Sequence, residues 1–158
     1  MIQNFIKKFT DKKIGEITEI GNQFFLADRE LLELKNKIKD EPFSFGTFLG
    51  EVRKNNFCPS IALLDMLSKL SDRKVFVNEK AEWLFLCGRD LFEEGIVKKN
   101  ADKGFVLVQN KLDENLGYGE IVSGRIAVKN FLDKGDFLRR ESAQRLDSRK
   151  LLPFKKFQ

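Results

Sequence analysis

Apolar residues in the first half of the chain recur with helical spacing in some stretches and with strand-like alternation in others. The spacing i, i+3, i+4 and i+7 near the N-terminus predicts one face of an amphipathic helix, formed by Ile2, Phe5, Ile6 and Phe9. Two short runs separated by Gly21-Asn22 predict a β-hairpin, because Gly-Asn suits its turn. The pattern also predicts a helix after the N-cap Asp28, a strand over 43–50, and a helix after the N-cap Ser60 whose inward face carries Leu63, Leu64, Leu67 and Leu70.

Beyond the charged segment 71–74 the pattern changes to short strands separated by turns, which is typical of a small β-barrel or sandwich. A short helix over 79–86 is predicted to direct Trp83, Leu84 and Leu86 inward. Strands are predicted at 74–77, 91–97, 104–109, 116–122, 125–128 and 136–140. The chain is therefore predicted to be α+β, with a small N-terminal α/β domain that contains an antiparallel sheet (1–72), a C-terminal β-rich domain (73–142) and a basic tail (143–158).

The composition is that of a globular protein and argues against the common catalytic and metal sites. The chain has no histidine, and its two cysteines, Cys58 and Cys87, match neither a redox pair nor a zinc site. The sixteen Phe are assigned to packing, because a phenyl ring has no polar group. No apolar run approaches the roughly 20 residues that span a bilayer, and the N-terminus lacks the apolar core of a signal peptide. These absences exclude the usual hydrolase and metalloenzyme sites and leave only catalysis by Glu, Lys or Asp. We expect a soluble, cytoplasmic, non-catalytic protein with no metal, cofactor or membrane contact.

The excess of positive charge lies at the C-terminus. From Arg139 onward there are seven Lys and Arg against two acidic residues, an excess of five, and the whole chain has 29 against 24, also five. The residues before Arg139 therefore have a formal net charge of zero. Such segregation indicates a polyphosphate partner, although a solvated tail has the same composition.

Several segments of the second half resemble a PUA domain, the RNA-binding pseudobarrel of pseudouridine synthases and archaeosine transglycosylases. Its opening resembles 74–78, the short helix, Leu86-Cys87-Gly88-Arg89 and 91–97, while Gly117-Tyr118-Gly119 and 137–141 resemble its later and closing strands. In the first half, 45–50 and 57–67 resemble the N-terminal domain of an archaeal and eukaryotic family of biogenesis factors for the large (60S-type) ribosomal subunit. The similarity covers roughly residues 20–141 and implies a C-terminal PUA-type β-pseudobarrel.

The resemblance implies that RNA lies along the short helix, the Gly88 turn and the closing strand. Glycine lets a backbone approach closely, and Arg89 offers a planar fork for phosphate, or forms a surface ion pair with Asp90. Arg139 and Arg140 are neighbours on the predicted closing strand, so their side chains would point to opposite faces. One of them would then face the RNA, and the other would form an ion pair with an acid such as Asp136 or Glu141. The candidate RNA-binding residues are Gly88, Arg89, Arg139, Arg140, Arg145, Arg149 and Lys150, the last three on one side of a helix if the tail folds on contact. Tyr118 is either a base-stacking ring or, more in keeping with its two flanking glycines, a core residue.

These observations predict a non-catalytic RNA-binding adaptor in large-subunit biogenesis and pre-rRNA processing. Its PUA domain would bind single-stranded rRNA or pre-rRNA, and its N-terminal domain other ribosome-assembly proteins, in the cytoplasm or, in a eukaryote, the nucleolus or nucleus. One alternative is an accessory subunit or remnant of an RNA-modifying enzyme with a catalytic acid in the first domain. That domain offers no cluster of Asp, His and Cys, and Asp65, on an apolar helix, is expected to cap or pair. Another alternative is a protein-interaction module whose tail binds an acidic partner.

Overall fold

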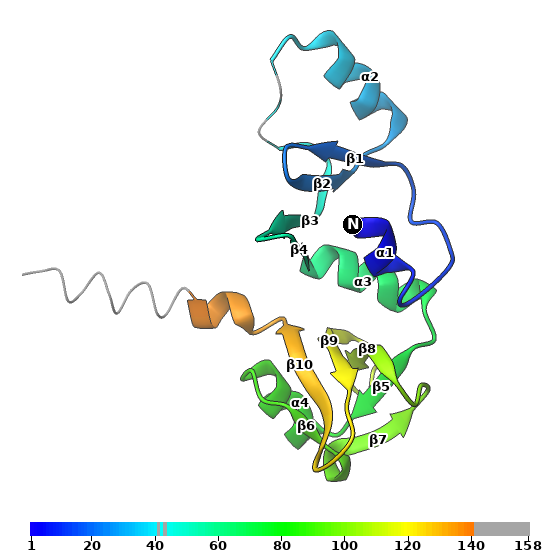
Figure 1. Cartoon of the computed structure of the whole chain (residues 1–158), viewed down its shortest axis with the longest axis vertical. Coiled ribbons are helices and arrows are strands. Elements are labelled where there is room, and N and C mark those ends of the chain that lie inside the picture. Colours follow the sequence, from blue (N-terminus) through cyan, green and yellow to red (C-terminus); the bar gives the residue numbers. More distant parts are fainter. Residues whose placement is uncertain (41, 43, 141–158) are drawn as a thin grey trace, which may run out of the picture.

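The computed structural model describes residues 1–40, 42 and 44–140, which form two stacked units with one sheet each (Figure 1). In the N-terminal unit, a four-stranded antiparallel sheet has the order β1-β2-β3-β4. Its elements are α1 (Ile2–Ile6), β1 (Ile17–Ile20), β2 (Gln23–Leu26), α2 (Arg29–Lys37), β3 (Thr47–Arg53), β4 (Asn56–Pro59) and α3 (Ile61–Leu70). The predicted antiparallel sheet is confirmed.

In the C-terminal unit, a six-stranded sheet has the order β6-β10-β9-β8-β5-β7 and curls into a nearly closed barrel. The β5–β8 pair is parallel, and the other neighbours are antiparallel. Its elements are β5 (Lys74–Val77), α4 (Glu79–Leu86), β6 (Leu91–Phe92), the 3-10 turn η1 (Glu93–Gly95), β7 (Ile96–Lys99), β8 (Gly104–Gln109), β9 (Asn115–Ile121) and β10 (Ile126–Asp133). The predicted α+β class with a barrel-like second half is confirmed.

Side-chain caps fix where three helices begin. The carboxylate of Asp28 accepts a hydrogen bond from the Leu31 backbone N–H at 2.9 Å, and the Ser60 hydroxyl accepts one from Leu63 at 3.1 Å. Asn78 caps α4 in the same way. Each cap satisfies a backbone donor that the first turn of a helix leaves without a partner. The predicted caps Asp28 and Ser60 are confirmed.

Two strands of the N-terminal unit differ from the prediction. The strand expected over 43–50 instead spans Thr47–Arg53, because Gly46 has a φ of +61° that interrupts extended backbone just before it. After β3, Lys54 and Asn55 both have positive φ, 48° and 63°, and form a tight turn that pairs β4 with β3. The sequence did not indicate β4, since a four-residue strand that ends in Pro carries little strand signal.

The expected closing strand at 136–140 is wrong, because the chain is helical from Asp136 to Arg140. The backbone N–H of Arg139 donates to the Gly135 carbonyl at 3.2 Å, a hydrogen bond between residues four apart. The Arg140 guanidinium lies 2.7 Å from the Asp136 carboxylate, an i,i+4 ion pair that stabilises a helix. A short apolar-then-basic run is compatible with either structure, and here these local contacts favour the helix.

The predicted inward position of Trp83 is also wrong. Its side chain is 65% exposed, whereas Ala81 and Phe85 are the buried residues of α4. These two residues are four apart, so they share the face that packs on the barrel, and Trp83 between them lies on the opposite side. The only tryptophan of the chain is therefore a surface residue.

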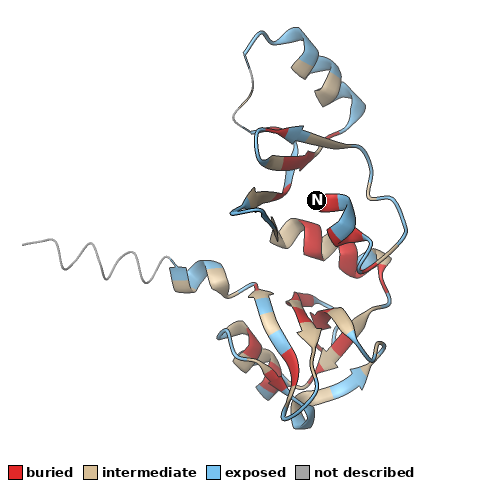
Figure 2. Cartoon of the chain, viewed as in Figure 1, coloured by how far each residue is buried: buried red, intermediate tan, exposed pale blue. Residues whose placement is uncertain are grey.

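The two units meet across one continuous apolar core. Helices α1 and α3 pack on the outer face of β8, β9 and β10, and Figure 2 shows buried residues on both sides of this junction. The cluster contains Ile2, Phe5, Ile6, Phe9, Phe24, Leu49, Leu63, Leu64, Leu67 and Leu107. Asp65 on α3 accepts a hydrogen bond from Asn115 of the barrel and forms an ion pair with Lys134, both at 3.0 Å, so its expected pairing is confirmed.

Tyr118 lies within this junction, and its phenol should lose its proton at a higher pH than that of an exposed tyrosine. Burial, and to a lesser degree the charge of Cys58, raises the pKa of its phenol to about 12. Because Tyr118 is the only tyrosine, absorbance of the folded chain should titrate near pH 12, against about pH 10 in denaturant. The folded pKa is the higher one, so this group contributes stability below about pH 10 that is lost as the pH rises toward 12. A folded midpoint near pH 10 would contradict the burial.

Candidate nucleic-acid interface

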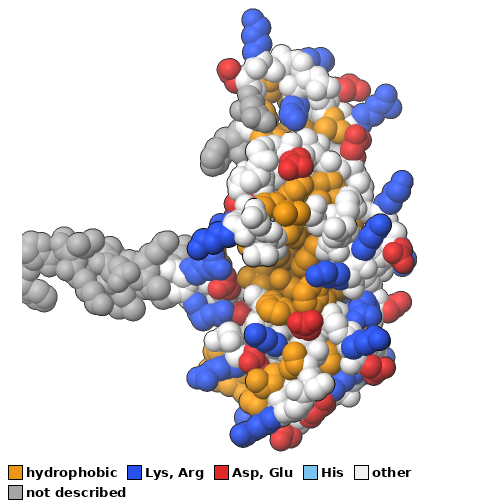
Figure 3. Space-filling view, in the orientation of Figure 1, with side chains coloured by type: hydrophobic (Ala, Val, Ile, Leu, Met, Phe, Trp, Pro, Cys, Tyr) orange, Lys and Arg blue, Asp and Glu red, His pale blue; other side chains and the backbone are white. Residues whose placement is uncertain are grey.

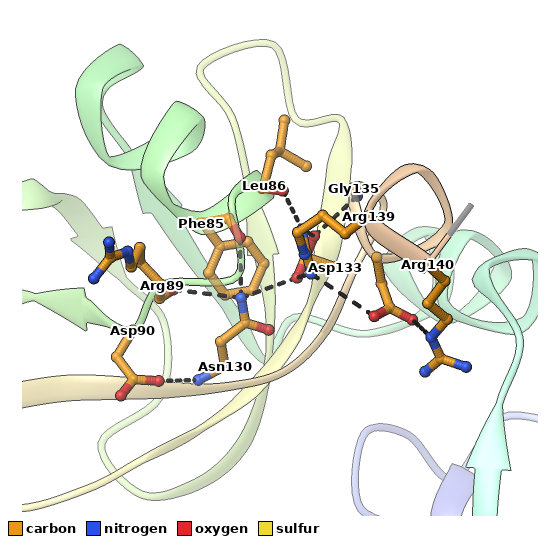
Figure 4. Close-up of polar contacts among 10 residues, drawn as sticks. Phe85, Leu86, Arg89, Asp90, Asn130, Asp133, Gly135, Arg139 and Arg140 are labelled. Carbon is orange, nitrogen blue, oxygen red and sulfur yellow. Dashed lines mark hydrogen bonds and ion pairs between the residues drawn. The ribbon is translucent and has the colours of Figure 1, made fainter. Parts of the chain in front are cut away.

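Arg139 is held by a buried carboxylate at the point where β10 ends (Figure 4). Its Nη1 donates to Asp133 Oδ1 at 2.9 Å and its Nη2 donates to Asp133 Oδ2 at 2.8 Å. Asp133 is only 2% exposed. The same Nη1 also donates to the backbone carbonyl of Leu86, the last residue of α4. A two-pronged pair of this kind is among the strongest hydrogen-bonded contacts in proteins, so Arg139 fixes α4 to the end of β10.

The turn at Gly88 is fitted around this guanidinium. Gly88 has a φ of +83°, which residues with a Cβ rarely adopt, and a Cβ there would lie 3.1 to 3.3 Å from guanidinium atoms of Arg139. The hydrogen bonds with Asp133 raise the pKa of Arg139, against the opposing effect of burial, and the charges of Asp133 and Asp136 raise it further. The structure thus brings together two of the predicted site residues, Gly88 and Arg139, as one structural contact.

Asn130 completes this network, and sequence reasoning missed both Asn130 and Asp133. The Asn130 side-chain amide donates to the carbonyls of Phe85 and Arg89 at 3.0 and 3.3 Å, and to Asp133 Oδ2 at 3.2 Å. The Phe85 carbonyl belongs to the last turn of α4 and the Arg89 carbonyl lies three residues beyond its end, so Asn130 links the segment that follows α4 to β10. One polar residue in a strand pattern does not reveal such a role, because the partners come from distant segments.

Two of the predicted cations lie at the ends of the network: the Arg89 side chain points away from it, and Arg140 is joined to it through Asp136 (Figure 4). Arg140 has a side chain that is 63% exposed and pairs with Asp136 at 2.7 Å. Arg89 is exposed, and no ion pair within residues 1–40, 42 and 44–140 includes it. Asp90 instead accepts a hydrogen bond from the Asn130 backbone N–H at 2.8 Å. Arg89 and Arg140 are thus two predicted site residues whose guanidinium groups reach the solvent at this face.

The expectation that Arg139 and Arg140 point to opposite faces of a strand is corrected by the helix. One turns inward to Asp133 and the other outward, because helical neighbours are rotated by about 100°. Asp136 lies 3.8 Å from Arg139 and 2.7 Å from Arg140, so this acid contacts both cations. Glu141 lies outside the described residues, as do the predicted tail residues Arg145, Arg149 and Lys150.

The surroundings of α4 add a further feature. A hollow of about 280 Å³ lies beside the helix, lined by Lys80, Leu84, Phe92 and others, together with the acids Asp90 and Glu94. Two carboxylates make this hollow a poor position for phosphate. Trp83, which the sequence analysis predicted to be in the core, instead presents a flat, exposed indole ring on the surface of the same helix.

The structure indicates neither a metal site nor a membrane span within the part of the chain that it describes. Across residues 1–40, 42 and 44–140, the His, Cys, Asp and Glu side chains form no group of three or more that suits a metal ion. None of the helices in those residues combines the length and apolar character needed to cross a bilayer. Both described cysteines, Cys58 and Cys87, are free.

Comparisons with known proteins agree with the barrel. The family model of the UPF0113 PUA domain matches residues 73–142. A UPF0113 protein of Archaeoglobus fulgidus is 30% identical over 112 residues, which cover 63% of this chain and 64% of that protein. The chain therefore spans just under two thirds of the length of this relative.

Relatives from vertebrates and one solved structure extend the match to the N-terminal unit. The 60S ribosome subunit biogenesis protein NIP7 homologs of Tetraodon nigroviridis and Xenopus laevis are 28% and 26% identical, over 76% and 75% of this chain and 74% and 73% of their own lengths. The structure of a conserved PUA domain protein from Thermoplasma acidophilum shares the fold, with a TM-score of 0.52, 19% identity, and coverage of 89% of this chain and 91% of that one. Residues 73–142 are thus similar to the UPF0113 PUA domain, and the longer matches show that the chain is similar to the NIP7 homologs over about three quarters of its length.

Proposed function

We propose that this protein is a non-catalytic RNA-binding adaptor in assembly of the large ribosomal subunit. Its PUA domain binds single-stranded rRNA or pre-rRNA at the face formed by α4, the Gly88 turn and the helical segment 136–140. The observation that supports this most directly is the Arg139–Asp133 pair. It fixes segment 136–140, which directly precedes the basic tail, next to α4 and leaves Arg89 and Arg140 exposed. The names of the NIP7 relatives as 60S biogenesis proteins support the cellular role.

Within this face the arginines have different roles. Arg139 is a positioning residue, because Asp133 neutralises its charge and its donors face protein acceptors. Arg89 and Arg140 contact phosphates, and the tail cations Arg145, Arg149 and Lys150 extend the basic surface along the RNA. Contacts with phosphates give an affinity that depends on salt concentration and little specificity for the RNA sequence. Trp83 adds a plate on which a base stacks.

The proposed division of labour follows the two units. Residues 73–142 and the tail 143–158 bind RNA, and residues 1–72 contact other ribosome-assembly proteins. The exposure of α2 supports the second role, because none of its residues is buried and Leu34 is 53% exposed. Its site of action is the cytoplasm, or the nucleolus if the cell is eukaryotic. The non-catalytic part of the proposal is supported by relatives that are named as biogenesis proteins rather than as enzymes.

Replacing Arg89 and Arg140 together with Glu should weaken binding of a fluorescein-labelled single-stranded RNA by roughly tenfold or more at low salt. The plot of log affinity against log salt should become shallower by about two, one for each lost phosphate contact. Fluorescence anisotropy measures both. Trp83 gives a second signal, because its emission in the unaltered protein should change when RNA covers α4.

A control with the same change of charge separates a specific face from a general field. Arg29→Glu with Lys37→Glu lies on α2, where both residues are exposed, and should leave the affinity within about twofold. If the two double variants lose affinity equally, the arginines beside α4 are not the site. If the unaltered chain fails to bind RNA in dilute buffer, the proposed function is wrong.

A further inference from the structure

A second hollow lies at the junction of the two units, away from the arginine network. Its volume is about 290 Å³, and it is bounded by the start of α1, the β3–β4 turn, β8 and β9. The described residues that line it are Met1, Asn4, Phe5, Lys8, Asn55, Asn56, Phe57, Phe105 and Tyr118. In Figure 3, hydrophobic side chains gather on the surface across this junction, with Lys and Arg side chains around them.

The floor of this junction hollow is aromatic. The rings of Phe5 and Phe57 are 5.2 Å apart between centroids, and Phe5 and Tyr118 meet edge to face at 5.4 Å. Phe105 lies 5.9 Å from Tyr118, and Phe131, which is 43% exposed, lies 5.6 Å from Phe105. Rings on adjacent strands that are packed on one side and open on the other form the kind of platform on which unpaired bases stack.

The rim of the hollow carries amides and a cation. Asn4, Asn55 and Asn56 supply side-chain groups that both donate and accept hydrogen bonds, which suits the mixed edge of a nucleobase. The ammonium of Lys8 lies 4.2 Å from the centroid of the Phe105 ring. None of the described residues that line the hollow is acidic. The combination of ring, amide and lysine without a carboxylate favours a ligand with a flat ring and a negative charge.

A neighbouring groove provides a path for the phosphates on either side of such a base. It has a volume of about 430 Å³ and shares Lys8 and Phe105 with the junction hollow. Arg73 and Lys103 also line it, so three cations face one carboxylate, that of Glu120. The local excess of positive charge favours a polyanion over an apolar peptide, whose recognition would not need it.

We propose that the junction hollow binds an unstacked base of single-stranded RNA, with Phe57, Phe105 and Tyr118 as the stacking rings and Lys8 near the backbone phosphate. The proposal rests on the proposed RNA-binding function and adds a second contact for the same strand. Phe131 lies on β10 two residues before Asp133, so one strand of the barrel joins the hollow to the arginine network. One RNA segment then spans both units, because the hollow is built from both.

The test uses a short single-stranded RNA in which uridines are replaced by 5-iodouridine, which crosslinks under ultraviolet light to aromatic side chains that stack on it. In the full chain we expect crosslinks at Phe57, Phe105 or Tyr118, mapped by mass spectrometry. Asn4→Asp with Lys8→Glu should remove these crosslinks and weaken binding about fivefold or more. Both positions are exposed, so the thermal unfolding midpoint should stay unchanged and confirm that the variant folds.

The matched control is Asn36→Asp with Lys37→Glu on α2, which makes the same chemical changes at exposed positions and should leave affinity and crosslinks unaltered. If the unaltered chain binds RNA without crosslinks at these rings, and the Asn4/Lys8 variant binds equally well, the inference is wrong and the hollow is left to a protein partner. Crosslinks and an affinity that both stay unchanged when Arg89 and Arg140 are replaced would support the hollow while rejecting the arginine face. No binding by the unaltered chain would overturn both.

Discussion

Replacing Arg139 with Glu should lower the free energy of unfolding by about 3 kcal/mol, since the buried Asp133 carboxylate would lose the guanidinium, itself 39% exposed, that compensates its charge. In this variant a second carboxylate would face Asp133, which is 2% exposed. The Leu86 carbonyl would also lose its donor, because a carboxylate accepts hydrogen bonds and does not donate them. For a chain of this length the unfolding midpoint should fall by roughly 6 to 12 °C.

The neighbouring arginine is the natural control for this experiment. Arg140→Glu should change stability by less than about 1 kcal/mol, because the Arg140–Asp136 pair is an exposed i,i+4 contact. Arg139→Lys, which keeps the charge and loses the planar fork, should fall between the two. Calorimetry or denaturation followed by circular dichroism gives the values. Equal stability of the two Glu variants would show that the bidentate contact does not hold α4 to β10.

Replacing Phe5 with Ala should lower the free energy of unfolding by about 3 to 5 kcal/mol, the usual effect of removing a buried aromatic ring. Phe5 is 6% exposed and belongs to the cluster that joins the two units. Its ring contacts Phe57 in the N-terminal sheet, and Phe105 and Tyr118 in the barrel. The cavity would therefore open between the units rather than inside one of them.

The shape of the unfolding curve is the informative part of this experiment. Since the core is shared, we expect one transition in both the parent and the Phe5→Ala protein, displaced to lower denaturant concentration in the variant. Leu34→Ala, at a side chain that is 53% exposed on α2, should leave the transition almost unmoved. Two separate transitions, only one of them shifted, would show that the units unfold independently.

Local chemistry allowed much of this fold to be predicted from the sequence. The N-caps Asp28 and Ser60 act through residues three positions away, so the pattern that predicts them is complete within one helical turn. The Gly21-Asn22 turn likewise joins β1 and β2 through adjacent residues. The order of short strands and turns in the second half indicated a small β-barrel or sandwich, and the resemblance of its motifs to a PUA domain implied the barrel.

The parts that the sequence did not predict depend on contacts between distant segments. Asp133 meets the end of α4 through Arg139, and nothing in the residues around Asp133 indicates a buried carboxylate. The same holds for Trp83, whose exposure is decided by which side of α4 meets the barrel. Segment 136–140 was wrongly predicted as a strand, since its i,i+4 ion pair fits a helix while its composition fits both.

Helices α1 and α3 cover one face of the barrel, so a fragment that lacks them would expose that face to solvent. A piece that starts at Arg73 would expose the outward-facing Phe105, Leu107 and Leu132, which pack beneath those helices in the whole chain. An uncovered apolar surface of this kind promotes aggregation. A minimal version of the barrel would therefore need polar substitutes at these three positions. Covering this side of the barrel is therefore a structural role of helices α1 and α3.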